Sequence, residues 1–272
     1  MDHPTVAILG AGSLGEIFAR GLLRAGWLPD DLILVTRRAE RAADLQKDTG
    51  IPTITSLGVG AEGRDVVIIS VKPNDVPTVL SEIRGCLTPD QVVVCLAAGV
   101  EIATLEAVLP NQPIIRAMPN TPAAVDLGMT ALSPGTSASD DDIARAHLVL
   151  GAVGETIELS EDLLDAVTAV SGTGPAYVFL LAEALIEAAI REGLPHHAAE
   201  KLVHQTIRGS GELLFQSDES AFRLRGQVTS PGGTTAAAMH VLEDGGFRAL
   251  MEDAVQSAAN RSRELGKRAI NP

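Results

Sequence analysis

The glycine-rich stretch Gly10–Gly15 limits the folds open to this chain more than any other part of its sequence. It follows the apolar run VAIL at residues 6–9 and precedes a helical pattern, with the spacing G-x-G-x-x-G. In that setting the first glycine makes a tight turn, the second lets a pyrophosphate approach the backbone, and the third lets helix and strand pack closely. A plain structural turn is the alternative, but the flanking strand and helix favour a dinucleotide site. The predicted cofactor contacts here are Gly10, Ala11, Gly12, Ser13, Leu14 and Gly15.

Short β-branched runs alternate with helical segments through the first half of the chain, which indicates a parallel sheet covered by helices. After about residue 160 only helical patterns remain, with a break expected at the SGTGP stretch of residues 171–175. We therefore predict an α/β fold, with an N-terminal Rossmann-type dinucleotide-binding domain over residues 1–160 and a C-terminal all-helical domain over residues 161–272. Strands are expected at 6–9, 32–35, 66–71, 92–96 and 113–117, and weaker ones at 129–132 and 155–159.

The overall charge limits the partners. A formal net charge of −14 disfavours nucleic acid and anionic membrane surfaces. The longest apolar run, residues 176–190, contains Glu183 and Glu187, so we expect a buried helix and no membrane span. Cys86 and Cys95 are expected to be reduced thiols, and the N-terminal residues show no signal-peptide pattern. These features together predict a cytoplasmic protein.

The end of the second predicted strand bears on the choice of cofactor. An NAD site places a carboxylate there to bind the ribose hydroxyls. This chain has Thr36, Arg37 and Arg38 instead, whereas Asp30 and Asp31 precede the strand at the opposite edge. Arginines form charge-assisted hydrogen bonds with a 2′-phosphate, so we predict a preference for NADP(H), with NAD(H) as the alternative.

Three further loops follow predicted strands and should lie at the same edge of the sheet. They contribute small residues, prolines and one lysine, Lys72, whose role is open between neutralising phosphate and capping a loop. The additional predicted cofactor contacts are Ser70, Val71, Lys72, Pro73, Ala97, Ala98, Gly99 and Asn120.

Two motifs in the helical half have no counterpart in a generic dinucleotide enzyme. They are DAVTAVSGTGPAYVFLLAEAL at residues 165–185 and VTSPGGTTAAAMHVLEDGGFR at residues 228–248. Together with the first glycine loop, SVKP, AAG and IRAMPNTP, they resemble pyrroline-5-carboxylate reductase over residues 5 to about 265. The chain departs from the usual pattern of that family at Ser13 and Leu14 and in its arginines after the second strand, which bears on cofactor preference and not on the reaction.

The resemblance implies that the chain reduces the cyclic imine 1-pyrroline-5-carboxylate to L-proline with NAD(P)H. It also implies a homodimer with interlocked helical domains, and it leaves open an assembly of five such dimers. In that arrangement the SPGGTT loop would face the cofactor across the dimer interface. The implied substrate contacts are Glu161, Ser230, Gly232, Gly233, Thr234 and Thr235.

Residue chemistry suggests what this loop would do. Bare backbone at Gly232 and Gly233, just before a helix, suits a carboxylate, although an ordinary glycine turn at a helix start has the same composition. Thr235 is predicted to orient the ring nitrogen and to exchange a proton with it. A protonated imine accepts hydride readily, so the mechanism needs mainly proximity and orientation. The six histidines lack metal-ligand spacing, and no metal site is predicted.

Three other functions are alternatives to reduction of 1-pyrroline-5-carboxylate. A β-hydroxyacid dehydrogenase would need a lysine from the central helix, but none follows SGTGP until Lys201. A reductase of another cyclic imine would have the same motifs. A non-catalytic dinucleotide sensor would keep the first glycine loop but would have no use for SPGGTT.

Overall fold

The computed structural model describes residues 3–270 of the chain. The described chain divides into two compact units. The first unit is discontinuous: it comprises the described residues up to Thr173 and those from Ser257 onward. The second unit covers Gly174–Gln256. The predicted boundary near residue 160 does not coincide with this division, because residues 161–173 and the end of the last helix pack with the sheet.

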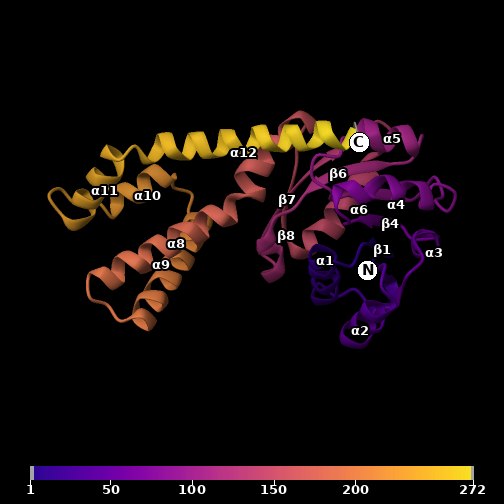
Figure 1. Cartoon of the computed structure of the whole chain (residues 1–272), viewed down its shortest axis with the longest axis horizontal. Coiled ribbons are helices and arrows are strands. Elements are labelled where there is room, and N and C mark those ends of the chain that lie inside the picture. Colours follow the sequence, from indigo (N-terminus) through magenta and orange to yellow (C-terminus); the bar gives the residue numbers. More distant parts are fainter. Residues whose placement is uncertain (1–2, 271–272) are drawn as a thin grey trace. The chain divides into compact units, whose positions relative to one another are not determined.

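The first unit is built on a sheet that comprises eight strands within the described residues (Figure 1), in the order β3-β2-β1-β4-β5-β6-β7-β8. Neighbouring strands are parallel except for β6 and β7, which are antiparallel. The seven strands expected from the sequence are all present, within a few residues of the expected ends. The strands are β1 (Val6–Leu9), β2 (Leu32–Val35), β3 (Thr53–Ile54), β4 (Val66–Ile69), β5 (Val92–Cys95), β6 (Ile114–Met118), β7 (Gly128–Pro134) and β8 (Gly154–Glu158).

Helices cover both faces of this sheet, as the uniformly apolar strands require. Alternate side chains of β1, such as Ile8 and Leu9, belong to two separate core clusters. The first cluster includes residues of α1, α2 and α6, and the second includes residues of α3, α4 and α5. These helices are α1 (Ser13–Arg24), α2 (Ala39–Thr49), α3 (Leu57–Ala61), α4 (Val76–Ile83), α5 (Ile102–Val108) and α6 (Asp140–Leu150).

The second unit is helical, as predicted. Its helices are α8 (Gly174–Arg191), α9 (His196–Gln216), α10 (Ala221–Gln227) and α11 (Thr234–Asp244), and α12 (Phe247–Ile270) begins in it. The residues between α8 and α9 contain Pro195 at the helix N-cap, and Gly232, at a φ of 69°, lies just before α11. Proline and positive-φ glycine therefore separate the helices where the sequence indicated.

The segment around SGTGP differs from the sequence expectation. In place of a break, α7 (Leu164–Val167) continues through a π-helical turn at Thr168–Gly172 into α8. The resulting helical run, Glu161–Arg191, is long and apolar enough to cross a membrane by length and composition, which is weak evidence for a membrane span. The expectation of a short segment was therefore wrong.

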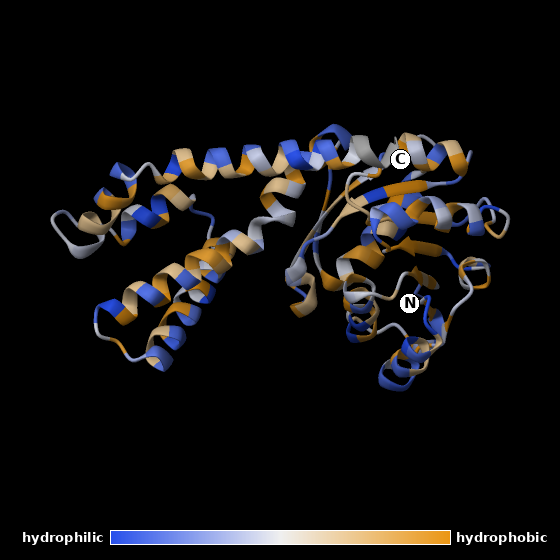
Figure 2. Ribbon diagram, viewed as in Figure 1, coloured by the Kyte–Doolittle hydropathy of each residue, from blue (hydrophilic) through white to orange (hydrophobic). Residues whose placement is uncertain are grey.

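The expected burial of this segment was also wrong for a single chain. None of the residues of α8 is buried, and most of its large apolar side chains, among them Phe179 and Leu180, are exposed. Figure 2 shows apolar residues along the length of this helix. An exposed apolar helix of this length is typical of a surface that another subunit covers.

Candidate functional site

Three of the predicted dinucleotide loops meet at one cavity in the first unit, with a volume of about 1070 Å³. It lies where β1, β2 and β4 end, because parallel strands place their carboxyl ends at one edge of the sheet. The predicted residues that line it are Gly10, Ala11, Gly12, Ser13, Thr36, Arg37, Arg38, Ser70, Val71 and Lys72. The lining also includes residues that the sequence analysis did not single out, namely Glu16, Val35, Arg41, Thr55, Leu57, Asp75, Thr78, Val79 and Glu82.

The three glycines of the first loop have different structural environments. Gly10 has a φ of 104°, and a Cβ there would lie 2.6 Å from Cγ1 of Val71. A Cβ on Gly15 would lie 2.4 Å from the carbonyl oxygen of Gly10, so helix and loop are packed in contact there. A Cβ on Gly12 would meet no atom within 4 Å, although Gly12 lines the cavity. This space beside Gly12 is available to a ligand's phosphate, as the motif requires.

Ser70 holds the glycine loop against β4. Its backbone N–H donates to the carbonyl oxygen of Leu9 at 2.9 Å, and its hydroxyl donates to the carbonyl oxygen of Gly10 at 2.8 Å. The backbone N–H groups of Gly10 and Ala11 both donate to the carbonyl oxygen of Val35, each at 2.9 Å. The loop is therefore fixed before any ligand arrives.

Three arginines line the cavity near the start of α2, and each has a different environment. Arg37 has 85% of its side chain exposed and lies 3.5 Å from the Asp75 carboxylate. Arg38 is the N-cap of α2 and has no ion-pair partner within residues 3–270. Arg41 forms a close ion pair with Glu16, which also accepts a 2.9 Å hydrogen bond from Arg20.

The carboxylate of Glu16 stays ionised between these cations. Burial acts to raise its pKa, but the hydrogen bonds from Arg20 and Arg41 outweigh that effect, so the pKa of Glu16 lies below its ordinary value. Glu16 and Arg41 line the cavity and Arg20 contacts Glu16, so the group of three has a net positive charge beside the cavity. In the sequence, the spacing of four residues between Arg37 and Arg41 indicates that Arg41 lies one helical turn after Arg37.

Several predicted cofactor residues do not line this cavity: Leu14, Gly15, Pro73, Ala97, Ala98, Gly99 and Asn120. Gly99, at a φ of 76°, instead packs against the backbone of Gly266 in α12. Asn120 donates from Nδ2 to the hydroxyl of Ser171 at 3.2 Å, and its Oδ1 accepts from the backbone of Met129 at 2.8 Å. Contact of these residues with a cofactor remains a prediction.

Glu161 makes contacts within the first unit. One of its oxygens, Oε1, accepts hydrogen bonds from the buried Arg116 on β6 and from the backbone N–H of Ile102, both at 2.8 Å. These bonds tie the start of α5 to the segment that leads toward the helical region. The structure thus gives Glu161 a positioning role, and its contact with a substrate remains a prediction.

The SPGGTT loop belongs to the second unit and precedes α11. The backbone N–H of Gly233 donates to the carbonyl oxygen of Ser230 at 3.0 Å, and the first helical bond runs from Ala237 to Gly233 at 3.1 Å. Within the described chain, no acceptor is present for the backbone N–H groups of Thr234 and Thr235. Such N–H groups at a helix N-terminus attract an anion.

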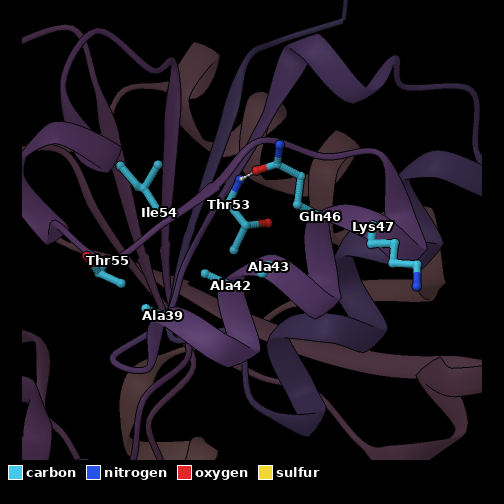
Figure 3. Close-up of a pocket in the computed structure, with 8 residues that line it drawn as sticks. All are labelled: Ala39, Ala42, Ala43, Gln46, Lys47, Thr53, Ile54 and Thr55. Carbon is cyan, nitrogen blue, oxygen red and sulfur yellow. Dashed lines mark hydrogen bonds between the residues drawn. The ribbon is translucent and has the colours of Figure 1, made fainter.

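A second hollow, of about 730 Å³, lies apart from the glycine loop (Figure 3). Side chains of α2, including Ala42 and Gln46, face the short edge strand β3, and Gln46 accepts from the backbone of Thr53 at 3.2 Å. It has no cluster of charged or nucleophilic groups. Across the described residues, no group of three or more His, Cys, Asp or Glu side chains gathers to hold a metal ion.

Comparisons with known proteins agree with both parts of the chain. A family model described as pyrroline-5-carboxylate reductase dimerisation matches residues 161–265, and one described as NADP oxidoreductase coenzyme F420-dependent matches residues 5–99. The pyrroline-5-carboxylate reductase of Corynebacterium melassecola is 39% identical over 97% of this chain and 99% of its own length. That of Mycobacterium tuberculosis H37Rv is 40% identical over 96% of both chains.

Solved structures of the same kind are similar over the whole chain. A pyrroline-5-carboxylate reductase from Coxiella burnetii has a TM-score of 0.92 at 36% identity, covering 97% of this chain and 99% of its own. The Plasmodium falciparum pyrroline carboxylate reductase with NADP bound has a TM-score of 0.87 at 29% identity, covering 98% and 99%.

Proposed function

Because this chain belongs to the pyrroline-5-carboxylate reductase family, we propose that it reduces L-1-pyrroline-5-carboxylate to L-proline, the last step of proline biosynthesis, with NADPH as its preferred cofactor. It is an NAD(P)H-dependent oxidoreductase with a Rossmann-type domain and a C-terminal helical dimerisation domain. The observation that carries the proposal is the cavity where bare backbone at Gly12 meets the arginines after β2.

The residues at the cavity fit a dinucleotide. Gly12 leaves room for a pyrophosphate beside the N-terminus of α1, and Arg38 offers a guanidinium that no carboxylate of the described residues occupies. The bound cofactor would supply the hydride, from its nicotinamide ring, to the imine carbon of the substrate. Ala97–Gly99 and Asn120 are proposed to line the nicotinamide end, since they follow β5 and β6 at the same edge.

The substrate is proposed to bind at the start of α11. The N–H groups of Thr234 and Thr235 would hold the carboxylate, with Ser230, Gly232 and Gly233 shaping the turn and Glu161 as a further contact. Thr235 would orient the ring nitrogen and exchange a proton with it. The reaction balances because the imine carbon gains the hydride while the nitrogen ends with the proton.

The proposal also covers how the protein assembles and in which compartment it acts. The C-terminal helices form a dimerisation domain, which accounts for the exposed apolar side chains of α8. We propose that the SPGGTT loop of one subunit completes the site of its partner, and that five dimers can form a decamer. The relatives and the fold are those of a soluble protein, and we place it in the cytoplasm.

The proposal is tested by turnover of purified protein with 1-pyrroline-5-carboxylate, following the loss of reduced-nicotinamide absorbance with NADPH and NADH in parallel. We expect turnover with both and a higher kcat/KM with NADPH. Protein that binds NADPH but does not oxidise it in the presence of this imine would contradict the proposed reaction and would indicate a different cyclic imine or a sensor.

A further inference from the structure

The three arginines at the cavity differ in how firmly they are held. Arg37 is largely in solvent, and its 3.5 Å contact with Asp75 is long. The Arg41 side chain is only 32% exposed and lies against Glu16, whose side chain is 23% exposed. An arginine that is already ordered loses less conformational entropy when it binds an anion, so Arg41 has the smaller entropy cost of binding.

Glu16 is itself fixed from its other side. Its Oε1 accepts a hydrogen bond from Nε of Arg20 at 2.9 Å and lies 2.8 Å from Nη2 of the same residue. Two nitrogens of Arg20 therefore contact this oxygen. Its second oxygen, Oε2, contacts Nη2 of Arg41. Arg41 thus uses one nitrogen on Glu16, and within the described chain no further partner occupies the rest of its guanidinium.

Charge at this wall favours a strongly anionic group. Arg20 and Arg41 together outweigh the single negative charge of Glu16, and Arg38 adds a cation at the N-cap of the same helix. The first turn of α2 adds the positive end of its helix dipole. A phosphate gains from all of these, whereas a neutral hydroxyl gains little.

We propose that Arg41 is a specificity-determining residue for the 2′-phosphate of NADPH, and that Glu16 is the positioning residue that aims it into the cavity. This rests on the proposed function, in that it assumes the cavity binds the adenosine half of the cofactor. It assigns the preference for NADPH to Arg41 in addition to the two arginines that directly follow β2.

The test measures binding and needs no turnover. The ligands are 2′,5′-ADP and 5′-AMP, which differ only in the 2′-phosphate, and their Kd values are measured by isothermal titration calorimetry on the full chain. Loss of a charge-assisted hydrogen bond predicts that Arg41→Ala weakens 2′,5′-ADP about tenfold or more and 5′-AMP by less than about twofold. Arg84→Ala, an exposed arginine that does not line the cavity, is the matched control and should change neither Kd.

A double-mutant cycle tests the part played by Glu16. If Glu16 positions Arg41, the loss of 2′,5′-ADP affinity caused by Arg41→Ala should shrink to less than half in a Glu16→Ala background. An undiminished or larger loss there would overturn the positioning role. If Arg41→Ala does not fold, as judged by circular dichroism, Arg41→Gln carries the same comparison, since it keeps a donor for Glu16.

Measuring binding and turnover separately distinguishes this inference from the proposed function. An unchanged ratio of the two affinities in the Arg41 variant overturns the role of Arg41 while leaving the reductase activity standing. A wild-type chain that binds 2′,5′-ADP no more tightly than 5′-AMP also overturns the role of Arg41, whereas turnover of the imine alone decides the proposed reaction. A selective loss of 2′,5′-ADP affinity in Arg41→Ala, in a protein that does not turn over the imine, supports the role of Arg41 and contradicts the reaction alone.

Discussion

Gly99 and Gly266 lie backbone against backbone, although 166 residues lie between them in the sequence. Gly99 is in the loop after β5, and Gly266 is near the end of α12. A Cβ on Gly99 would lie 3.0 Å from the backbone nitrogen of Gly266, and one on Gly266 would lie 3.0 Å from the carbonyl oxygen of Gly99. Gly99 also has a φ of 76°, which L side chains rarely adopt. The contact holds the AAG loop against the last helix, within the first unit.

Gly99→Ala should therefore destabilise the protein through both strain and crowding. Positive φ costs about 1–2 kcal/mol for a residue with a Cβ, and overpacking adds about 1–3 kcal/mol. Gly63→Ala is the matched control, because Gly63 has a φ of 67° and its Cβ would meet no atom within 4 Å. Thermal unfolding should show a larger fall in Tm for Gly99→Ala, and equal falls would show that the Gly266 contact contributes nothing.

Two substitutions in the first glycine loop should differ in their effects on NADPH affinity and on the free energy of unfolding. Gly12→Ala places a methyl group in open space beside the cavity, so we expect unfolding free energy within about 1 kcal/mol of wild type and a large loss of NADPH affinity. Gly15→Ala drives a methyl group toward the carbonyl oxygen of Gly10, so it should cost about 3 kcal/mol of stability. Urea unfolding and NADPH titration on both variants check this, and NADPH affinity retained in Gly12→Ala would contradict it.

The buried thiol of Cys95 predicts a loss of stability in alkali. Burial raises its pKa from 9.0 to about 11, while a backbone hydrogen bond with Ala97 and the charge of Arg116 act in the opposite direction. A raised pKa in the folded state means that the stabilisation is complete below about pH 9 and is lost as pH rises through about 11. Between roughly pH 8 and pH 10 the loss should be about 1 kcal/mol.

This loss is measured by urea unfolding of the wild type and of Cys95→Ala at both pH values. Cys86 is present in both proteins, so the difference between their pH slopes isolates Cys95. Parallel slopes would show that the folded thiol titrates as it does in the unfolded chain.

Thr235 should matter through its hydroxyl. Thr235→Ala is expected to lower kcat/KM with 1-pyrroline-5-carboxylate by about tenfold to a hundredfold, the range for one hydrogen bond to a charged group. Thr235→Ser keeps the hydroxyl and should retain most of the activity. Steady-state kinetics at saturating NADPH make the comparison, and wild-type kcat/KM in the alanine variant would remove the assigned role.

The exposed apolar face of α8 should be needed for self-association. Leu180, with 66% of its surface exposed in the single chain, is expected to be covered by the partner subunit, so Leu180→Glu should shift the protein toward monomer. Val59→Glu introduces the same charge at a position 62% exposed in the first unit and should leave the assembly unchanged. Sedimentation velocity distinguishes them, and a wild-type monomer that is stable and active would exclude the dimeric site.

Local patterns were sufficient to predict the sheet and most of the cavity. Uniformly apolar runs with intervening helices predicted seven strands in a parallel sheet, and the glycine spacing predicted the loop after β1. The pairing of β6 with β7 is antiparallel and departs from that prediction. The two-residue strand β3 was missed because Thr53–Ile54 is too short to show a period. Its pairing with β2 comes from the tertiary fold.

Contacts between distant residues could not be predicted in the same way. The Arg116–Glu161 bond joins residues 45 apart, and Asn120 reaches Ser171 across 51 residues. The apolar composition of α8 indicates that its surface must be covered, either by its own chain or by a second subunit, and in the single chain none of its residues is buried. Arg41 was overlooked because its importance depends on Glu16, 25 residues earlier.

The division of the chain has a consequence for its synthesis. The first unit comprises residues on both sides of Gly174–Gln256, and its final part is the end of α12 from Ser257 onward. Translation proceeds from the N-terminus, so the sheet and its glycine loop leave the ribosome long before Ser262, which donates a hydrogen bond to Asp165, or Gly266, which packs on Gly99. The AAG loop of the nascent chain therefore cannot pack against α12 until all of the second unit has been synthesised.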